Sequence, residues 1–218
     1  MARPNRRGRA IYLSCAGVLL ALLGVGTSFV SRHDGDIAAS PPDPEARPLP
    51  LVVGSPEVSH VDRGLSRIAN QLGHGQAEVR CWSTSEWQVL LRNLGSGDVN
   101  AYTTVDRRLV HLPWYTCSWL HVVAMRGLSR LDRAKALAPF AHELEHLRGV
   151  DGEAEAECYS YQHLAEVAEA LAASRDESGR LAEVAWRELY PPSDPAYVSP
   201  ECRNGGRLDL HPQRRSWP

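Results

Sequence analysis

The spacing of apolar positions along the chain predicts a helix-rich α+β protein. Apolar residues recur at helical spacing over residues 57–72, 85–94, 117–126, 131–147, 153–173 and 180–189. Short apolar runs predict strands over residues 78–83, 99–105 and 109–112, the last two forming a hairpin. The proline-rich tail from Tyr190 predicts a coil. We therefore expect a small domain with a short β-hairpin or sheet beneath several helices.

The longest apolar run covers residues 11–30, near the start of the chain. As a helix it would be about 30 Å long, which is enough to span a bilayer. Arginines within residues 1–10 predict that this segment stays in the cytoplasm and that the rest of the chain lies outside. The alternative is a signal peptide cleaved near residues 37–40, which would make the protein secreted. We favour an uncleaved transmembrane anchor, because the apolar core of a signal peptide is normally only about 7–15 residues long.

Residues 31–50 separate this run from the rest of the chain and contain five closely spaced prolines. A proline-rich segment favours an extended, semi-rigid spacer. We therefore expect a linker here and one extracytoplasmic domain over residues 51–218. The chain is 43% hydrophobic and 23% charged, which suits one globular domain. Its net charge of −2 argues against a nucleic-acid partner.

Cysteine usage agrees with export. The expected domain contains four cysteines: Cys81, Cys117, Cys158 and Cys202. An even number outside the cytoplasm favours two disulfides, for which three connectivities exist. We favour Cys81–Cys117 and Cys158–Cys202, because each pair would join neighbouring segments of one half of the domain. Free buried thiols are the alternative.

The motif His142-Glu143-Leu144-Glu145-His146 carries the candidate chemistry. On a helix, residues i and i+4 lie on the same face, so both imidazoles can reach one Zn²⁺ ion. Glu143 is offset, so that its carboxylate can meet a metal-bound water instead of the metal. Zinc lowers the pKa of such a water, and a carboxylate base can then take its proton during attack on a carbonyl.

A catalytic zinc needs a third protein ligand, and a glutamate-rich helix follows the motif after a tight turn. Glu153 and Glu157 are one helical turn apart and share a face, whereas Glu155 points elsewhere. This block resembles the gluzincin zinc peptidases, in which the first glutamate of the second helix binds zinc. The resemblance implies that Glu153 is the third ligand and that Glu157 supports a zinc-bound histidine. The resemblance covers about residues 138–162. The same block also resembles that of small uncharacterised secreted proteins of bacteria.

Two features depart from related patterns. The connection between the two helices is shorter here than in large membrane gluzincins, and Glu157 stands where an aspartate is usual. The metzincin pattern HExxHxxGxxH matches at Gly149, but Gly152 occupies its third-ligand position and has no side chain to bind zinc. We therefore exclude the metzincin class.

The remaining polar and aromatic residues have less specific interpretations. We expect five further histidines to be ordinary surface or core residues: His60, His74, His111, His121 and His163. One of them, or Tyr159 or Tyr161, is a candidate for stabilising the oxyanion. Residues 110–113 are a candidate strand edge beside a substrate cleft. Glu155, Glu166 and Glu169 are expected on a solvated helix face.

Together these features predict a membrane-tethered zinc metallopeptidase that hydrolyses peptide bonds in a peptide or protein substrate. His142, His146 and Glu153 would bind zinc, and Glu143 would act as general base and then as proton donor to the leaving amine. The alternative is a disulfide-stapled, anchored binding module with a structural or vestigial zinc site. The presence of Glu143 favours the enzyme, because a structural zinc does not need a base.

Overall fold

Four short strands form a mixed sheet at the centre of the fold. The structure is a computed structural model that describes residues 11–14, 58–95, 99–123, 128–191 and 193–214. The strands are β2 (His60–Val61), β3 (Glu78–Trp82), β4 (Ala101–Thr104) and β5 (Leu109–Pro113), in the order β4-β5-β3-β2. β3 and β5 run parallel, whereas the other neighbouring pairs are antiparallel. The expected α+β class is confirmed.

The predicted hairpin is present as β4 and β5, with Tyr102 opposite His111. The turn between them is a short 3-10 helix, η1 (Val105–Arg107), and it ends at Arg108 in the left-handed conformation (φ 48°). The expectation that residues 110–113 form a strand edge is wrong. β5 pairs with β4 on one side and with β3, in parallel, on the other, so it is interior to the sheet.

A further strand, β1 (Ile11–Ser14), pairs antiparallel with β4, where Ile11 is opposite Thr104. At these four residues the structure has a strand where the apolar run predicts a membrane helix. The rest of the predicted anchor and the linker over residues 31–50 lie outside the described residues. Among the described helices, none combines the length and the apolar character needed to cross a membrane.

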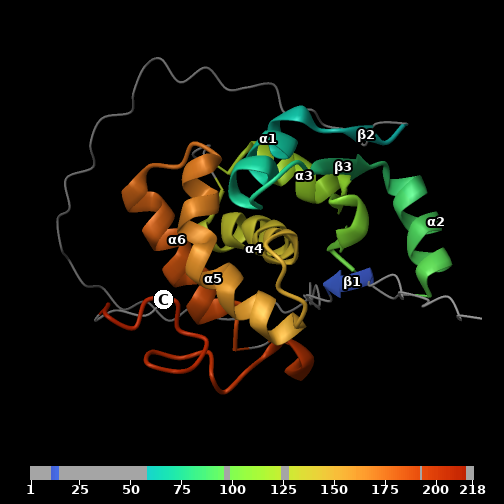
Figure 1. Cartoon of the computed structure of the whole chain (residues 1–218). Helices are drawn as coiled ribbons and strands as arrows, with labels where there is room; N and C mark the ends of the chain where they lie inside the picture. The colour runs from blue at the N-terminus through green and yellow to red at the C-terminus, as the bar shows by residue number, and fades with distance from the viewer. Residues whose placement is uncertain (1–10, 15–57, 96–98, 124–127, 192, 215–218) are drawn as a thin grey trace, which may run out of the picture. The chain divides into compact units, whose positions relative to one another are not determined.

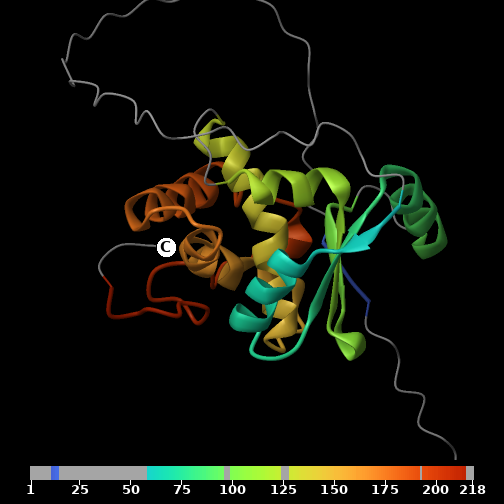
Figure 2. The same cartoon turned by 90° about the horizontal axis from the view of Figure 1, so that it is seen from above.

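Helices cover the sheet on two sides (Figures 1 and 2). α1 (Arg63–Leu72), α4 (Arg130–Leu147), α5 (Glu153–Ala170) and α6 (Arg175–Glu188) lie on one side, and α2 (Thr84–Leu94) lies on the other. α3 (Trp114–His121) follows β5 directly. α4 packs against α5, α6, α3 and β4, so it is the central helix of the fold.

Capping residues explain where three helices differ from the predicted boundaries. α1 begins later than predicted, because Asp62 caps it by accepting from the backbone N–H of Leu65 and β2 precedes it. α2 begins one residue earlier than predicted, because Ser83 caps it by accepting from the backbone N–H of Glu86. α6 begins five residues earlier than predicted, because Ser174 caps a polar first turn that carries no apolar signal.

The core surrounds α4, in which every residue from Ala136 to Leu147 is buried. Pro139 lies inside this helix and removes one backbone donor, yet the helix continues to Leu147. Two disulfides cross-link elements of the fold: Cys81–Cys117 joins β3 to α3, and Cys158–Cys202 joins α5 to the C-terminal tail. The favoured pairing is therefore confirmed.

Candidate metal centre

The two motif histidines and Glu153 come from two consecutive helices. His142 and His146 lie one turn apart near the end of α4, and both are fully buried. A short turn through Gly149 (φ +94°) reverses the chain, and Glu153 is the first residue of α5. The turn therefore brings the start of α5 beside the end of α4, which is the arrangement that the sequence predicts.

The three donor atoms are close enough to share one ion. The Nε2 atoms of His142 and His146 are 3.0 Å apart, and the Oε2 atom of Glu153 is 3.0 Å from the first and 3.6 Å from the second. In a tetrahedral zinc site with bonds of about 2.0–2.1 Å, neighbouring donors are about 3.3 Å apart. The donor spacing therefore fits zinc.

The second nitrogen of each imidazole is held by a hydrogen-bond acceptor. The Nδ1 atom of His142 is 2.7 Å from the Oε2 atom of Glu157, and the Nδ1 atom of His146 is 2.7 Å from the carbonyl oxygen of Val150. An acceptor at Nδ1 fixes a proton there and leaves Nε2 as the metal-binding atom. Glu157 therefore lies beside the imidazole of His142, which is the position that the gluzincin resemblance implies for it.

The electrostatics favour a cation among these atoms. Burial lowers the pKa of His142, but hydrogen bonds to Glu153 and Glu157 outweigh burial and raise this pKa to about 10. Burial raises the pKa of Glu153, but hydrogen bonds to His142 and His146 reverse the direction and lower it to about 2. The carboxylates of Glu153 and Glu157 on either side of His142 therefore favour positive charge at this position.

Glu143 is fully buried beside the donors, and neither of its carboxylate oxygens has a hydrogen-bond partner among the described residues. Burial raises the pKa of Glu143 to about 7, although the imidazoles of His142 and His146 act in the opposite direction. The neighbouring strand β4 contributes Thr103, whose hydroxyl is 3.5 Å from the backbone carbonyl of Glu143. A buried carboxylate without hydrogen-bond partners lowers the stability of the folded protein, and such groups are expected where a ligand or a reactant completes the site.

Glu145, the second acidic residue of the motif, has a different environment that the sequence does not reveal. It is buried and accepts hydrogen bonds from Arg148 (2.7 Å) and His163 (2.9 Å). Arg148 also donates to the carbonyl of Leu72 on α1 and to Glu166 on α5. This network joins α1, α4 and α5 at the turn that carries Val150. Glu166 itself is exposed, as expected for a solvated helix face.

Tyr197 is an aromatic residue of the site that sequence analysis missed. It lies in the tail on the 3-10 helix η2 (Pro195–Tyr197), is buried, and has its ring centre 5.7 Å from that of His142. Tyr159 instead donates to Glu155, and Tyr161 packs edge-on against Trp186 and Tyr190. No motif marks Tyr197 in the sequence, because the tail that carries it reaches the site through contacts with the distant helix α5, among them the Cys158–Cys202 disulfide and the hydrogen bond from Gln162 to the carbonyl of Leu208.

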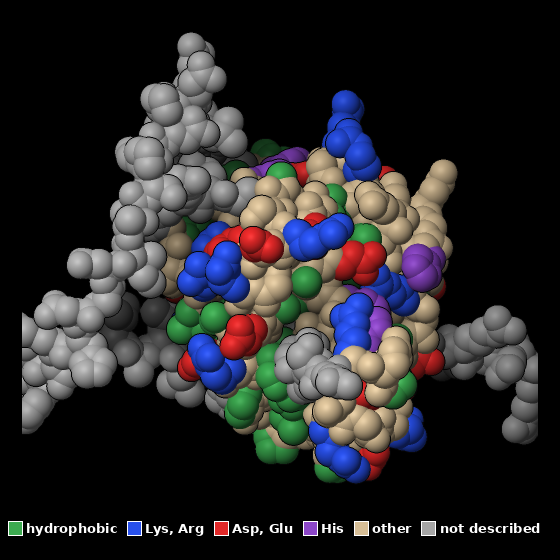
Figure 3. All heavy atoms as spheres, turned by 90° about the vertical axis from the view of Figure 1, so that its left-hand side faces the viewer, with side chains coloured by type: hydrophobic (Ala, Val, Ile, Leu, Met, Phe, Trp, Pro, Cys, Tyr) green, Lys and Arg blue, Asp and Glu red, His purple; other side chains and the backbone are tan. Residues whose placement is uncertain are grey.

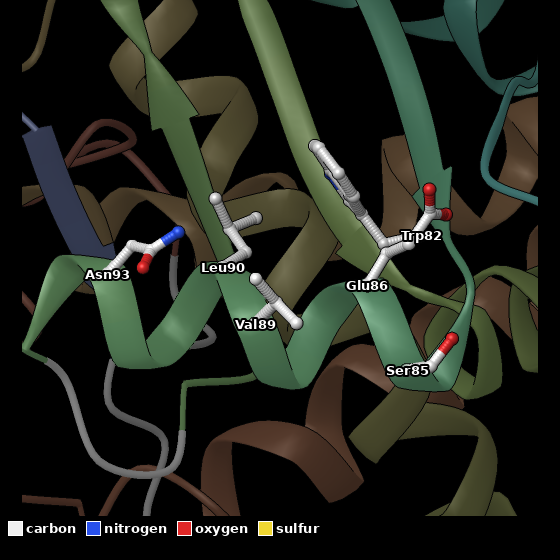
Figure 4. A pocket seen from close by; sticks show the side chains of 6 residues that line it. All are labelled: Trp82, Ser85, Glu86, Val89, Leu90 and Asn93. Atoms are coloured by element: carbon white, nitrogen blue, oxygen red, sulfur yellow. The ribbon is translucent and has the colours of Figure 1, made fainter.

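Two further regions resemble binding sites but include none of the three candidate metal donors. His60, Asp62 and Cys81 lie near one another, but Cys81 is in a disulfide and Asp62 is bound to His121 at 2.6 Å. A hollow of ≈ 400 Å³ beside α2 is lined mainly by apolar and uncharged side chains (Figure 4): Trp82, Ser85, Glu86, Val89, Leu90 and Asn93. This hollow lies beside α2, on the side of the sheet away from α4.

Comparison with known proteins finds no relative of this chain. No protein-family model, no curated protein and no solved structure matches this chain. The gluzincin resemblance therefore stands on the residues and on the geometry described above.

Proposed function

We propose that the protein is a zinc-dependent metallopeptidase of the gluzincin type. The observation that carries this proposal is the convergence of three donors, from His142, His146 and Glu153, beside the buried and unpartnered carboxylate of Glu143. Three protein donors are the number found in catalytic zinc sites, which keep a fourth position open, whereas structural sites use four.

Zinc, when bound, supplies a Lewis acid that activates a water molecule for attack on a peptide carbonyl. Glu143 would act as the general base that accepts a proton from the attacking water, and it would then donate this proton to the leaving amine. A pKa near the working pH suits this role, because the same group must accept and then donate a proton. Glu157 and the Val150 carbonyl hold the two imidazoles in the orientation that binds the metal.

We further propose that the enzyme is tethered to the membrane by residues 11–30 and acts outside the cytoplasm. The arginines before the apolar run and the two disulfides support this location. Strand β1 and a membrane helix exclude each other at residues 11–14, so a membrane-extraction experiment, described in the Discussion, separates the two arrangements.

The substitution Glu143→Gln tests the enzymatic proposal. It keeps the size of the side chain and removes the base, so cleavage of unfolded protein substrates should fall by about two to four orders of magnitude. Zinc content should stay near one per chain. Glu169→Gln on the exposed part of α5 is the matched control and should leave activity unchanged. A chelator should abolish the wild-type activity.

Two outcomes would contradict the proposal. Equal cleavage by wild type and Glu143→Gln would mean that the activity is not this protein's. If both proteins hold zinc and neither cleaves a broad panel of substrates, the binding module with a structural zinc becomes the better explanation.

A further inference from the structure

A hollow of ≈ 720 Å³ lies on the surface between α1, the start of β3 and the turn η1. Its lining includes four arginines: Arg63, Arg67, Arg107 and Arg108. Glu78 is the one acidic side chain among the lining residues. The chain as a whole carries 24 basic and 26 acidic residues, so this excess of positive charge is local. We call this feature the arginine groove.

One of the four arginines has a structural role. Arg108 donates to three backbone carbonyls, those of Gln76 (2.7 Å), Gly73 (2.7 Å) and Leu147 (3.1 Å). These bonds tie the hairpin turn to the ends of α1 and α4. The need to satisfy carbonyls at two helix ends therefore explains Arg108.

The other three arginines have no such explanation. Arg63, Arg67 and Arg107 are exposed, and among the described residues none of them has an ion pair or a side-chain hydrogen bond. The face formed by α5 and α6 is different, because its basic and acidic side chains lie interspersed (Figure 3). On α6, for example, Arg187 pairs with Glu188 at 2.9 Å and with Glu183 at 3.7 Å.

The positions of Arg63 and Arg67 are unfavourable for the helix that carries them. Arg63 is the first residue of α1; the carboxylate of the N-cap residue Asp62 is already bound to His121 at 2.6 Å, and the first turn itself contains no acidic residue. A cation near a helix N-terminus opposes the helix dipole, and two like charges at i and i+4 repel each other. Helix stability therefore does not account for these arginines, whereas a bound anion would offset both effects.

We propose that the arginine groove binds a phosphate-bearing ligand. The planar guanidinium group donates two parallel hydrogen bonds to phosphate oxygens and keeps its charge at all physiological pH values. Arg63 and Arg67 approach from α1 and Arg107 from the hairpin turn, so donors face the groove from two sides. A phosphate monoester offers three acceptor oxygens and nearly two charges, whereas a phosphodiester headgroup offers two oxygens and one charge, so a monoester matches the three free arginines best. This inference does not depend on the proposed peptidase activity.

The phosphate can come from a lipid headgroup or from a soluble ester, and two arms of one experiment separate these sources. The full chain, held in uncharged detergent, is titrated with inorganic phosphate and with glycerol 3-phosphate. In the second arm it is placed in phosphatidylcholine bilayers with or without phosphatidylglycerol. The measurement in both arms is the NMR shift of the Nε–H groups of Arg63, Arg67 and Arg107.

We expect saturable shifts in these three signals in at least one arm, weakening as salt is added. The double variant Arg67→Gln/Arg107→Gln should bind at least about tenfold more weakly, because it loses two charge-assisted donors. The matched control, Arg175→Gln/Arg187→Gln on α6, removes the same charge and should bind like wild type. Both pairs are exposed, so thermal unfolding should stay unchanged and serves as the check on folding.

A response only to phosphatidylglycerol supports the proposal with a lipid source, and a response only to the soluble phosphates supports it with a soluble source. The absence of shifts in both arms would overturn it. So would equal loss of binding in the two double variants, or an equal response to acetate at the same concentration.

Discussion

Removing the carboxylate of Glu157 should weaken zinc binding without removing a ligand. Its Oε2 atom lies 2.7 Å from the Nδ1 atom of His142, and the side chain is buried. Loss of such a partner of a metal-binding histidine typically costs about 10- to 100-fold in metal affinity, which corresponds to about 1.4–2.7 kcal/mol. We therefore expect Glu157→Ala to raise the zinc dissociation constant by that factor.

A second substitution separates the hydrogen bond from the charge. Glu157→Gln keeps an oxygen that can accept from the Nδ1–H group, so its zinc affinity should fall between those of Glu157→Ala and wild type. Glu155→Ala is the control, because Glu155 accepts a hydrogen bond from Tyr159 and not from a metal ligand. The assay is competition with a coloured chelator at pH 7, with circular dichroism to check that each variant is folded.

The reasoning fails if a folded Glu157→Ala protein binds zinc as tightly as wild type. It also fails if Glu157→Gln and Glu157→Ala lose the same affinity, because the loss would then come from altered packing or charge and not from the hydrogen bond.

Three further predictions concern the rest of the molecule. Burial, with Arg80 and Arg107 nearby, lowers the pKa of His111 to about 3. The stabilisation of the folded state by neutral His111 is therefore complete above the unfolded pKa of about 6.5, and it is lost as the pH falls toward 3. The free energy of unfolding should therefore drop by about 2 kcal/mol between pH 7 and pH 5, and this slope should disappear in His111→Gln. Replacing both cysteines of the Cys158–Cys202 disulfide by serine should cost up to about 4 kcal/mol, because the bond closes a loop with a sequence separation of 44; an unchanged midpoint in urea would contradict this. Finally, full-length protein should stay in the membrane fraction after alkaline carbonate extraction if residues 11–30 form an anchor, whereas release would favour strand β1 or a cleaved signal.

The sequence alone is enough to predict the motif-bearing helix pair and the hairpin. Helical periodicity and β-propensity are local signals, and both elements consist of residues close together along the chain. The spacing of His142, His146 and Glu153 also predicts their convergence, because i,i+4 geometry and a tight turn leave little freedom between them.

Other parts of the site depend on contacts between distant segments and have no local signal. Nothing in the sequence marks the environment of Glu145, yet its buried carboxylate accepts hydrogen bonds from Arg148 and from His163 on the next helix. Tyr197 reaches His142 from a tail that the sequence marks only as a proline-rich coil. Helix boundaries set by a single capping serine, such as Ser174, are equally hidden from apolar periodicity.

The short stretch that carries the metal donors has a consequence for how the molecule assembles. His142 through Glu157 are 16 consecutive residues, so binding an ion closes only short loops and costs little chain entropy. The α4–α5 hairpin can thus acquire its metal early in folding, from local contacts alone. Thr103 of β4 and Tyr197 of the tail join this hairpin only when remote segments dock. If the proposed site binds zinc, the zinc content would therefore report on the helix pair, whereas the surroundings of Glu143 depend on the completed fold.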